Sequence, residues 1–275
     1  MVAAVSGGAD SSALLVLATE AGCDLTAVHV DHRLRPGSGD EADVVATLAG
    51  RLGARFVGVA APVAPGPNVE ARARHARRAV LPDGAMTGHT LDDQAETVLL
   101  NLVRGSALDG LAGMRPGPTK PLLGLRRAET RALCRESGIV PLDDPMNVDR
   151  RLRRVRVRHE VLPLLDEVAQ RDVAVVVARG AALLDDDARL LDRLAAGLDP
   201  TDGRALATAS PPLARRAVRR WLVAGGCAHP PDAATVERVL EVARGRWRAT
   251  EVGHARRVVR SRGRLRLEPV RTSRP

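Results

Sequence analysis

The chain of 275 residues has a single lysine, Lys120, and only three aromatic residues. The Walker phosphate loop requires a lysine after a glycine, and Lys120 instead follows Thr119. The chain is therefore not a nucleotide-binding protein of the Walker type. Proteins that stack single-stranded bases on aromatic platforms need more than Phe56, Trp221 and Trp247. Any contact with nucleic acid must therefore depend on arginine and on shape.

Cysteine is scarce, and long apolar runs are absent. Cys23, Cys134 and Cys227 are isolated and odd in number, which indicates neither a disulfide framework nor a CxxC metal or redox site. No apolar run approaches the ~20 residues of a membrane-spanning helix, and no basic segment typical of a signal peptide follows Met1. We therefore expect a cytoplasmic protein with no membrane partner.

Positive charge is unevenly distributed along the chain. Residues 1–149 have 15 Lys+Arg and 18 Asp+Glu, a net charge of −3, whereas residues 150–275 have 27 and 15, a net charge of +12. Arginine makes up 41 of the 42 basic residues, so part of this excess reflects a general compositional bias. The difference between the halves is not explained by that bias, and it predicts a polyanion-binding surface in the C-terminal half.

The segment at residues 6–11, SGGADS, lies between an apolar run typical of a strand and an apolar-periodic run typical of a helix. Paired glycines let the backbone approach a ligand closely, and the first amides of a helix attract anions. The ordinary interpretation is a simple turn capped by Ser11. We favour a phosphate-binding loop, in which Asp10 holds Mg²⁺ or fixes the loop. The predicted nucleotide-binding residues are Ser6, Gly7, Gly8, Ala9, Asp10 and Ser11.

Strands and helices alternate through the first half of the chain. We expect strands at residues 2–5, 25–30, 55–60 and 85–88, and helices at 13–20, 38–52, 68–80 and 91–104. This alternation predicts a parallel, doubly wound α/β sheet, whose ligands bind at the carboxyl ends of the strands. Ser38 with Glu41, and Asn68, are the predicted caps of two helices.

Three loops should meet at that edge of the sheet. The second loop contains His29, Asp31 and His32, which resemble a metal cluster, but we favour satisfied polar residues at a strand end because His29 and Asp31 alternate with apolar residues.

The third loop contains His89, Asp92, Asp93 and Glu96. Positions 89, 93 and 96, and likewise 92 and 96, share one helix face. The helix dipole accounts for two of the acids. Three acids beside a nucleotide cleft suit Mg²⁺, a cationic substrate or proton transfer, and these alternatives stay open. Arg104 begins the following glycine-punctuated loop and is a candidate partner for a phosphate.

Six arginines occupy the nine positions from 150 to 158. A run of this density with no interleaved acid repels itself, and a phosphate-rich partner would relieve the repulsion. Beyond it we expect one or two helices at residues 160–194, helices at 211–225 and from Asp232 to 245, and a hairpin at 252–270. This half is predicted to be a mainly helical accessory domain.

These motifs resemble those of the bacterial tRNA(Ile)-lysidine synthetases, members of the ATP-pyrophosphatase (PP-loop) superfamily. SGGADS resembles the superfamily's SGGxDS loop, and HVDHRLRP, GHTLDDQAETVLLNLVRGSALDGLAGM and DPMNVDRRLRRVRVRHEVLPLL are more specific. The resemblance covers about residues 2–165. Met146 stands where the family has a small residue, and Val155 where it usually has an asparagine.

The resemblance implies a catalytic domain at residues 1–150 and a basic, helical tRNA-binding domain at residues 151–275. It further implies a ligase that uses ATP and Mg²⁺ to adenylate C2 of the wobble cytidine in CAU-anticodon tRNA(Ile). Free L-lysine then displaces AMP to form lysidine. The implied catalytic residues are Asp92, Asp93, Glu96 and Arg104. The implied contacts of tRNA and lysine are His89, Arg150, Arg151, Arg154, Arg156 and Arg158.

Two alternatives stay open. One is a tRNA 2-thiolation enzyme of the same superfamily, which would need a cysteine pair or an iron–sulfur site; the scattered cysteines argue against it. The other is a non-catalytic RNA-binding relative, against which the intact SGGADS and GHTLDDQAET motifs argue. The sequence does not decide the oligomeric state, and a homodimer remains open.

Overall fold

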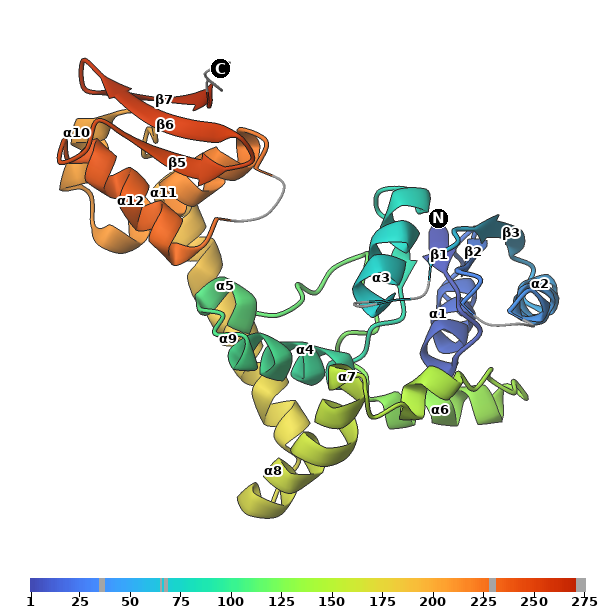
Figure 1. Ribbon diagram of the computed structural model, residues 1–275. Helices are drawn as coiled ribbons and strands as arrows, with labels where there is room; N and C mark the ends of the chain where they lie inside the picture. The colour runs from blue at the N-terminus through green and yellow to red at the C-terminus, as the bar shows by residue number, and fades with distance from the viewer. Residues whose placement is uncertain (35–37, 65, 67–68, 228–230, 271–275) are drawn as a thin grey trace. The chain divides into compact units, whose positions relative to one another are not determined.

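The computed structural model describes residues 1–34, 38–64, 66, 69–227 and 231–270 (Figure 1). By their internal contacts these residues form two compact units, Met1–Asp185 and Asp186–Pro275. The domain boundary expected at residues 150 and 151 was inferred from charge and motifs, and it stays a prediction. No helix within the described ranges is long and apolar enough to cross a membrane.

The first unit contains a four-stranded parallel sheet in the order β3-β2-β1-β4. Its strands are β1 Val2–Ala4, β2 Thr26–Asp31, β3 Arg55–Ala60 and β4 Met86–Thr87. The chain proceeds outward from β1 to β3 and then returns to place β4 on the other side of β1. This reversal is the mark of a doubly wound sheet, and ligands bind where it occurs, between the carboxyl ends of β1 and β4.

Helices follow each strand in the expected alternation. They are α1 Ala9–Glu20, α2 Asp40–Arg51, α3 Val69–Val80 and α4 Leu91–Val103. The expected capping box of Ser38 and Glu41 is wrong, because the cap position of α2 is Gly39, which has no side chain to cap it, and the Ser38 hydroxyl instead bonds the Asp31 carboxylate. Asn68, the other predicted cap, lies outside the described residues.

The core of this unit lies between the sheet, α1 and α6. Leu14 and Leu15 of α1 are almost completely buried, as are Ala3 and Ala27 of the central strands. Burying such side chains contributes roughly 1.5–3 kcal/mol for each large residue, so this layer fixes α1 on the sheet. The loop that joins β1 to α1 is thereby held in one position.

Shorter helices complete the first unit. They are α5 Leu108–Leu111, α6 Arg127–Glu136, η1 Pro145–Val148, α7 Arg153–Arg156, η2 Val157–Val161, α8 Leu162–Ala169 and the start of α9 Val173–Ala196. A second, smaller core joins α4 to η2, α8 and α9 through Ala95, Val157, Leu162 and Ala174. The arginine-rich segment therefore packs directly against the helix that has the acids.

The described part of the second unit combines the end of α9 and three shorter helices with a small antiparallel sheet. Its elements are α10 Gly203–Thr208, α11 Pro211–Ala224, α12 Ala233–Ala243, β5 Ala249–Gly253, β6 Arg256–Ser261 and β7 Arg264–Pro269. Asp232 caps α12 as predicted, because its side chain accepts a hydrogen bond from the Thr235 amide. The predicted hairpin is wrong in extent: β5 adds a third strand to β6 and β7, so the sheet order is β5-β6-β7.

Candidate functional site

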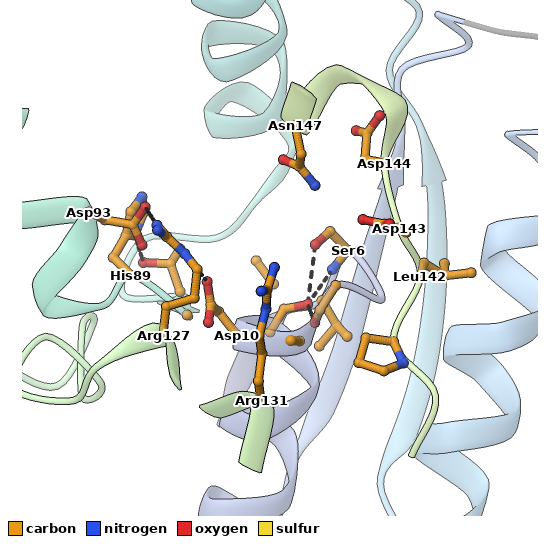
Figure 2. A pocket seen from close by; sticks show the side chains of 18 of the residues that line it. Ser6, Asp10, His89, Asp93, Arg127, Arg131, Leu142, Asp143, Asp144 and Asn147 are labelled. Carbon is orange, nitrogen blue, oxygen red and sulfur yellow. Dashed lines mark hydrogen bonds and ion pairs between the residues drawn. The ribbon is translucent and has the colours of Figure 1, made fainter. Parts of the chain in front are cut away.

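A cavity of about 840 Å³ lies at the carboxyl ends of the parallel strands. It is lined by Ser6 and Asp10 after β1, by His32 after β2 and by His89 after β4, so the three predicted loops do meet. Figure 2 shows His89, Asp93 and Arg127 on one side of the pocket and Asp143 and Asp144 on the other. The volume is within the range of small-molecule sites.

The SGGADS loop is held open by its own hydroxyls. The Ser6 amide donates to the Ser11 Oγ over 3.1 Å, and the Ser11 hydroxyl donates to the Gly8 carbonyl over 2.9 Å. No side chain caps α1, whose cap position is Gly8, so the interpretation of Ser11 as a simple cap is wrong. Gly8, Ala9, Asp10 and Ser11 line the cavity, so the start of the helix borders it, and helix N-termini are sites that bind phosphate.

Two glycines are required by close approaches. Gly7 has a φ of +84°, and a Cβ there would lie 2.4 Å from Leu142 Cδ1. The Leu142 amide donates to the Gly7 carbonyl over 2.9 Å, which ties the segment before η1 to the loop. At Gly88, a Cβ would lie 2.6 Å from the Asp10 carbonyl oxygen, so the end of β4 touches the first turn of α1. A side chain at Gly88 would meet the backbone of α1 and displace the loop, whereas at Gly7 the positive φ is what disfavours a side chain.

Asp10 is held from α6. Its carboxylate accepts a hydrogen bond from the Thr130 hydroxyl and lies 3.6 Å from the Arg127 guanidinium. Burial raises the pKa of Asp10, while Thr130 and Arg127 oppose that shift. Asp10 is therefore a fixed carboxylate on the loop, with one oxygen committed to Thr130.

Helix α6 also presents a stripe of arginines that the sequence interpretation missed. Arg127, Arg131 and Arg135 are spaced four residues apart, share a helix face and line the cavity. Within the described residues, neither Arg131 nor Arg135 forms an ion pair with a carboxylate. The four-residue repeat was visible in the sequence, but an amphipathic surface helix has the same pattern.

The acids of α4 form a buried network with three arginines. Glu96 is completely buried, and its carboxylate accepts hydrogen bonds from Arg158 and Arg154 over 2.7 Å each and from Arg127 over 3.2 Å. Asp93 lies 2.9 Å from Arg127 and 3.3 Å from Arg154. Burial alone would raise the pKa of both carboxyls, but the surrounding guanidinium groups outweigh it and hold each pKa below its usual range.

The same acids also begin the helix. The Thr90 side chain accepts from the Asp93 amide while Asp93 accepts from the Thr90 amide, a capping box that the sequence interpretation did not identify. Asp92 accepts from the Arg127 amide over 2.7 Å and pairs with Arg126 over 3.0 Å. Asp93 alone of the three lines the cavity.

His89 lies at the end of β4, next to Thr87 and Asp93. The Thr87 hydroxyl forms a hydrogen bond of 2.8 Å with Nδ1 of His89 and lies 3.1 Å from the Thr119 carbonyl oxygen. Burial lowers the pKa of His89 to about 4, with Asp93 opposing the shift. The imidazole lines the cavity.

The arginine run divides into two faces. Arg154 and Arg158 point inward to Asp93 and Glu96, and Arg158 also lines the cavity. The outward set consists of Arg150, Arg151, Arg153 and Arg156. The catalytic candidate Arg104 is exposed at the far end of α4 and does not line the cavity. The roles inferred for these residues stay predictions.

Gln94 accounts for the glycine at position 113, in the loop after α4. Its amide group donates to the Met114 carbonyl over 2.9 Å and accepts from the Met114 amide over 2.7 Å. A Cβ at Gly113 would lie 2.7 Å from the Gln94 Oε1 atom. The loop was expected to approach a ligand, whereas this glycine makes room for Gln94.

The remaining polar residues either lie within the fold or line the side of the cavity opposite α4. His29 is buried and its Nδ1 donates to the Val5 carbonyl over 3.0 Å, while its buried Nε2 has no partner among the described residues, so the expected satisfaction is only partial. Within the described ranges, no three His, Cys, Asp or Glu side chains are grouped to hold a metal ion. Asp143, Asp144 and Asn147 line the cavity opposite α4, and the sequence interpretation assigned them no role (Figure 2).

Comparison with known proteins identifies the family. Residues 1–165 match the PP-loop domain family, and residues 204–266 match the TilS substrate binding domain. The chain is 45% identical to the tRNA(Ile)-lysidine synthase of Nocardia farcinica, over 83% of this chain and 77% of that protein. The chain belongs to the tRNA(Ile)-lysidine synthase family. The relative from Rhodococcus erythropolis is also 45% identical, over 82% of this chain and 74% of its own length.

A solved structure supports the same fold. The U34-tRNA thiolase NcsA of Methanococcus maripaludis, described with its [4Fe-4S] cluster, matches with a TM-score of 0.54 at 20% identity, over 67% of this chain and 71% of that chain. At this identity the likeness is one of fold alone. Membership of the lysidine synthase family, with its PP-loop domain, implies that the chain uses ATP as the source of energy.

Proposed function

We propose that the chain is a tRNA-modifying ligase that joins lysine to C2 of the wobble cytidine of CAU-anticodon tRNA(Ile). The C2 oxygen attacks the α-phosphorus of ATP and pyrophosphate leaves. The lysine amine then attacks C2, AMP departs with that oxygen, and the amine loses a proton. The observation that supports this proposal best is the cavity at the β1–β4 reversal, where the uncapped SGGADS loop faces the arginines of α6.

ATP would bind with its phosphates on the loop. The free amides at the start of α1 and the Ser6 hydroxyl donate to phosphate oxygens, and Arg131 and Arg135 supply charge from α6. Arg127 and Arg158 line the same cavity while their other nitrogens are held by Glu96. Preorganised donors of this kind stabilise charge that develops as pyrophosphate leaves.

The acids of α4 then act by positioning. Glu96 touches no cavity space and already binds three arginines, so we assign it to the orientation of Arg127 and Arg158. Asp92 holds the start of α6 in the same way. Arg104, at the far end of α4, would contact tRNA outside the cavity.

Lysine would enter on the opposite wall. Asp143 and Asp144 offer carboxylates to a cationic substrate there, and His89 lines the cavity on the facing side, next to Asp93 (Figure 2). A Mg²⁺ ion would be held by phosphate oxygens with Asp10 as its protein ligand, since Mg²⁺ commonly binds one or two carboxylates plus substrate phosphates. When bound, it would supply charge that screens the phosphates.

The direct test is AMP release with ATP, L-lysine and tRNA transcripts that differ only in the anticodon. We expect lysine-dependent AMP with the CAU transcript and none above background with the GAU transcript. Tritiated lysine should appear in the tRNA in the same ratio. If AMP does not appear when all substrates are present, the proposal is wrong, and if sulfur instead of lysine enters the tRNA, the 2-thiolation alternative is correct.

A further inference from the structure

A cluster of cations lies on α3 and on the turn at residues 117–120, outside the functions assigned above. It consists of Arg74, Arg77, Arg78 and Lys120, and we call it the α3 patch. Arg77 lines the nucleotide cavity. The Thr87 amide, at the end of β4, donates to the Thr119 carbonyl over 2.9 Å, which holds Lys120 beside the same strand end. The patch therefore adjoins the mouth of the cavity.

The patch is a concentration of like charge. Burial lowers the pKa of Lys120, and the nearby cations Arg74 and Arg78 lower it further. Burial likewise lowers the pKa of the Arg77 guanidinium, and Arg78 and Arg154 add to the effect. Within the described residues, Arg77, Arg78 and Lys120 form no ion pair with a carboxylate. An anionic partner would reduce the repulsion among these cations.

Helix α3 has few packing contacts with the rest of the first unit. None of its described side chains is buried, and in the described part of the chain it packs only sparsely on other helices and strands. An ordinary surface helix buries an apolar stripe against the core. The buried apolar layer of this unit lies between the sheet, α1 and α6 instead, and on α3 Arg78 is exposed while Arg77 is half-buried at the cavity.

We propose that the α3 patch binds the RNA backbone phosphates on either side of the nucleotide whose base enters the cavity. A base that enters the cavity brings its own backbone to the cavity edge, and Arg77 lines the cavity with the rest of the patch beside it. The inference rests on the proposed function for the identity of the RNA. It adds a tRNA contact on the first unit, besides the positive charge of the C-terminal half. Phosphate contacts position a nucleic acid and carry no sequence information, so the patch should hold any tRNA in that place.

Lys120 makes the first test unusually specific, because the chain has no other lysine. An amine-reactive acetylating reagent can modify only Lys120 and the Met1 amino group, and Met1 lies at the opposite end of β1 and serves as an internal reference. We expect CAU tRNA, without ATP or lysine, to slow acetylation of Lys120 in proportion to the protein bound and to leave Met1 unchanged. Protection by ATP alone, or equal protection of both amines, would overturn the proposal.

The second test compares two double variants that remove the same charge. Arg78→Ala with Lys120→Ala alters the patch beside β4, whereas Arg51→Ala with Arg55→Ala alters the β3 edge of the sheet. Each phosphate contact contributes about 0.7–0.9 to the slope of log affinity against log salt, so the slope for the patch variant should be shallower by about 1.5. The control should keep the wild-type slope.

Equal slopes for the two variants would overturn the proposal. Neither test requires turnover, so its outcome is independent of lysine-dependent AMP release. If the α3 patch binds tRNA and no AMP is formed, the proposed reaction is wrong and the proposed tRNA-binding surface is still supported.

Discussion

The arginines of residues 150–158 have two different surroundings within one short segment. Arg154 and Arg158 are 20% and 23% exposed and bind the carboxylates of Asp93 and Glu96 on α4. Arg151 and Arg156 are 90% and 62% exposed and pair only with neighbours in the same segment, Asp149 and Glu160. The same residue type therefore stabilises the fold on one face and leaves charge for a partner on the other.

The difference arises from the packing of the segment. Val155 and Val157 are buried, and Val157 joins the small core with Ala95 of α4. Once these valines face α4, helical geometry directs Arg154 and Arg158 toward the acids there. An isolated buried carboxylate would cost several kcal/mol, so Glu96 depends on these arginines as much as they depend on it.

The largest expected effect follows from breaking the inward network. Glu96→Gln keeps the side-chain shape and leaves three guanidinium groups around a neutral amide, and removal of one partner of a buried pair typically costs about 3–5 kcal/mol. We expect a loss at the lower end of that range in urea unfolding of the full chain. Asp149→Asn, which removes an exposed partner of Arg151, is the control and should leave the unfolding midpoint unchanged.

The pH dependence of stability tests the same network. The folded protein holds the pKa values of Asp93 and Glu96 below their usual range, so the unfolded chain binds more protons as the pH falls. Their stabilisation is complete above the unfolded pKa, near 4.5 for Glu96, and is lost on further acidification. Glu96→Gln should flatten this acid limb. An unchanged limb would show that the network contributes nothing.

A smaller effect should separate Arg158 from Arg156 in catalysis. Arg158 lines the cavity and Arg156 does not. Removal of one preorganised donor typically costs about 10²–10³ in kcat, and we expect Arg158→Ala to lie at the lower end because Arg127 remains. Arg158→Lys should restore the charge but not the planar fork, and recover only part of the rate.

Arg156→Ala is the matched control and should keep wild-type kcat and KM for ATP in AMP release. Similar losses for both alanine variants would mean that the two faces of the run do not differ in function. Urea unfolding of each variant separates a loss of rate from a loss of folded protein.

Local patterns predicted the parts of the site that depend on one segment. SGGADS, the alternation of strands and helices, and the meeting of three loops all follow from backbone rules, and the structure confirms the sheet and the cavity. Asp232 as a helix cap was likewise predicted from its own neighbourhood.

The predictions that were wrong or incomplete concern residues whose partners lie far away in the sequence. The acids of α4 were interpreted as open to a ligand because no sequence rule places Arg127, 31 residues from Glu96, or Arg158, 62 residues away, beside them. Thr90 was passed over as a cap although it lies three residues before Asp93. The third strand, β5, pairs with β6 and packs against α12. The alternating pattern of β6 and β7 contains no information about that packing, so β5 was not predicted.

The smallest expected effect on stability belongs to the outward arginines, and it completes the comparison. Arg150→Ala, Arg151→Ala and Arg153→Ala together remove exposed charge whose ion pairs lie at the surface, where pairs contribute little because water and salt screen them. We expect an unchanged unfolding midpoint. The salt slope of tRNA affinity should fall by about 0.7–0.9 for each backbone phosphate that the variant no longer binds, whereas Arg51→Ala with Arg55→Ala should leave it as in the wild type. If the triple variant instead unfolded as readily as Glu96→Gln, the outward face would be part of the core network, and the division of the run into a structural and a binding face would be wrong.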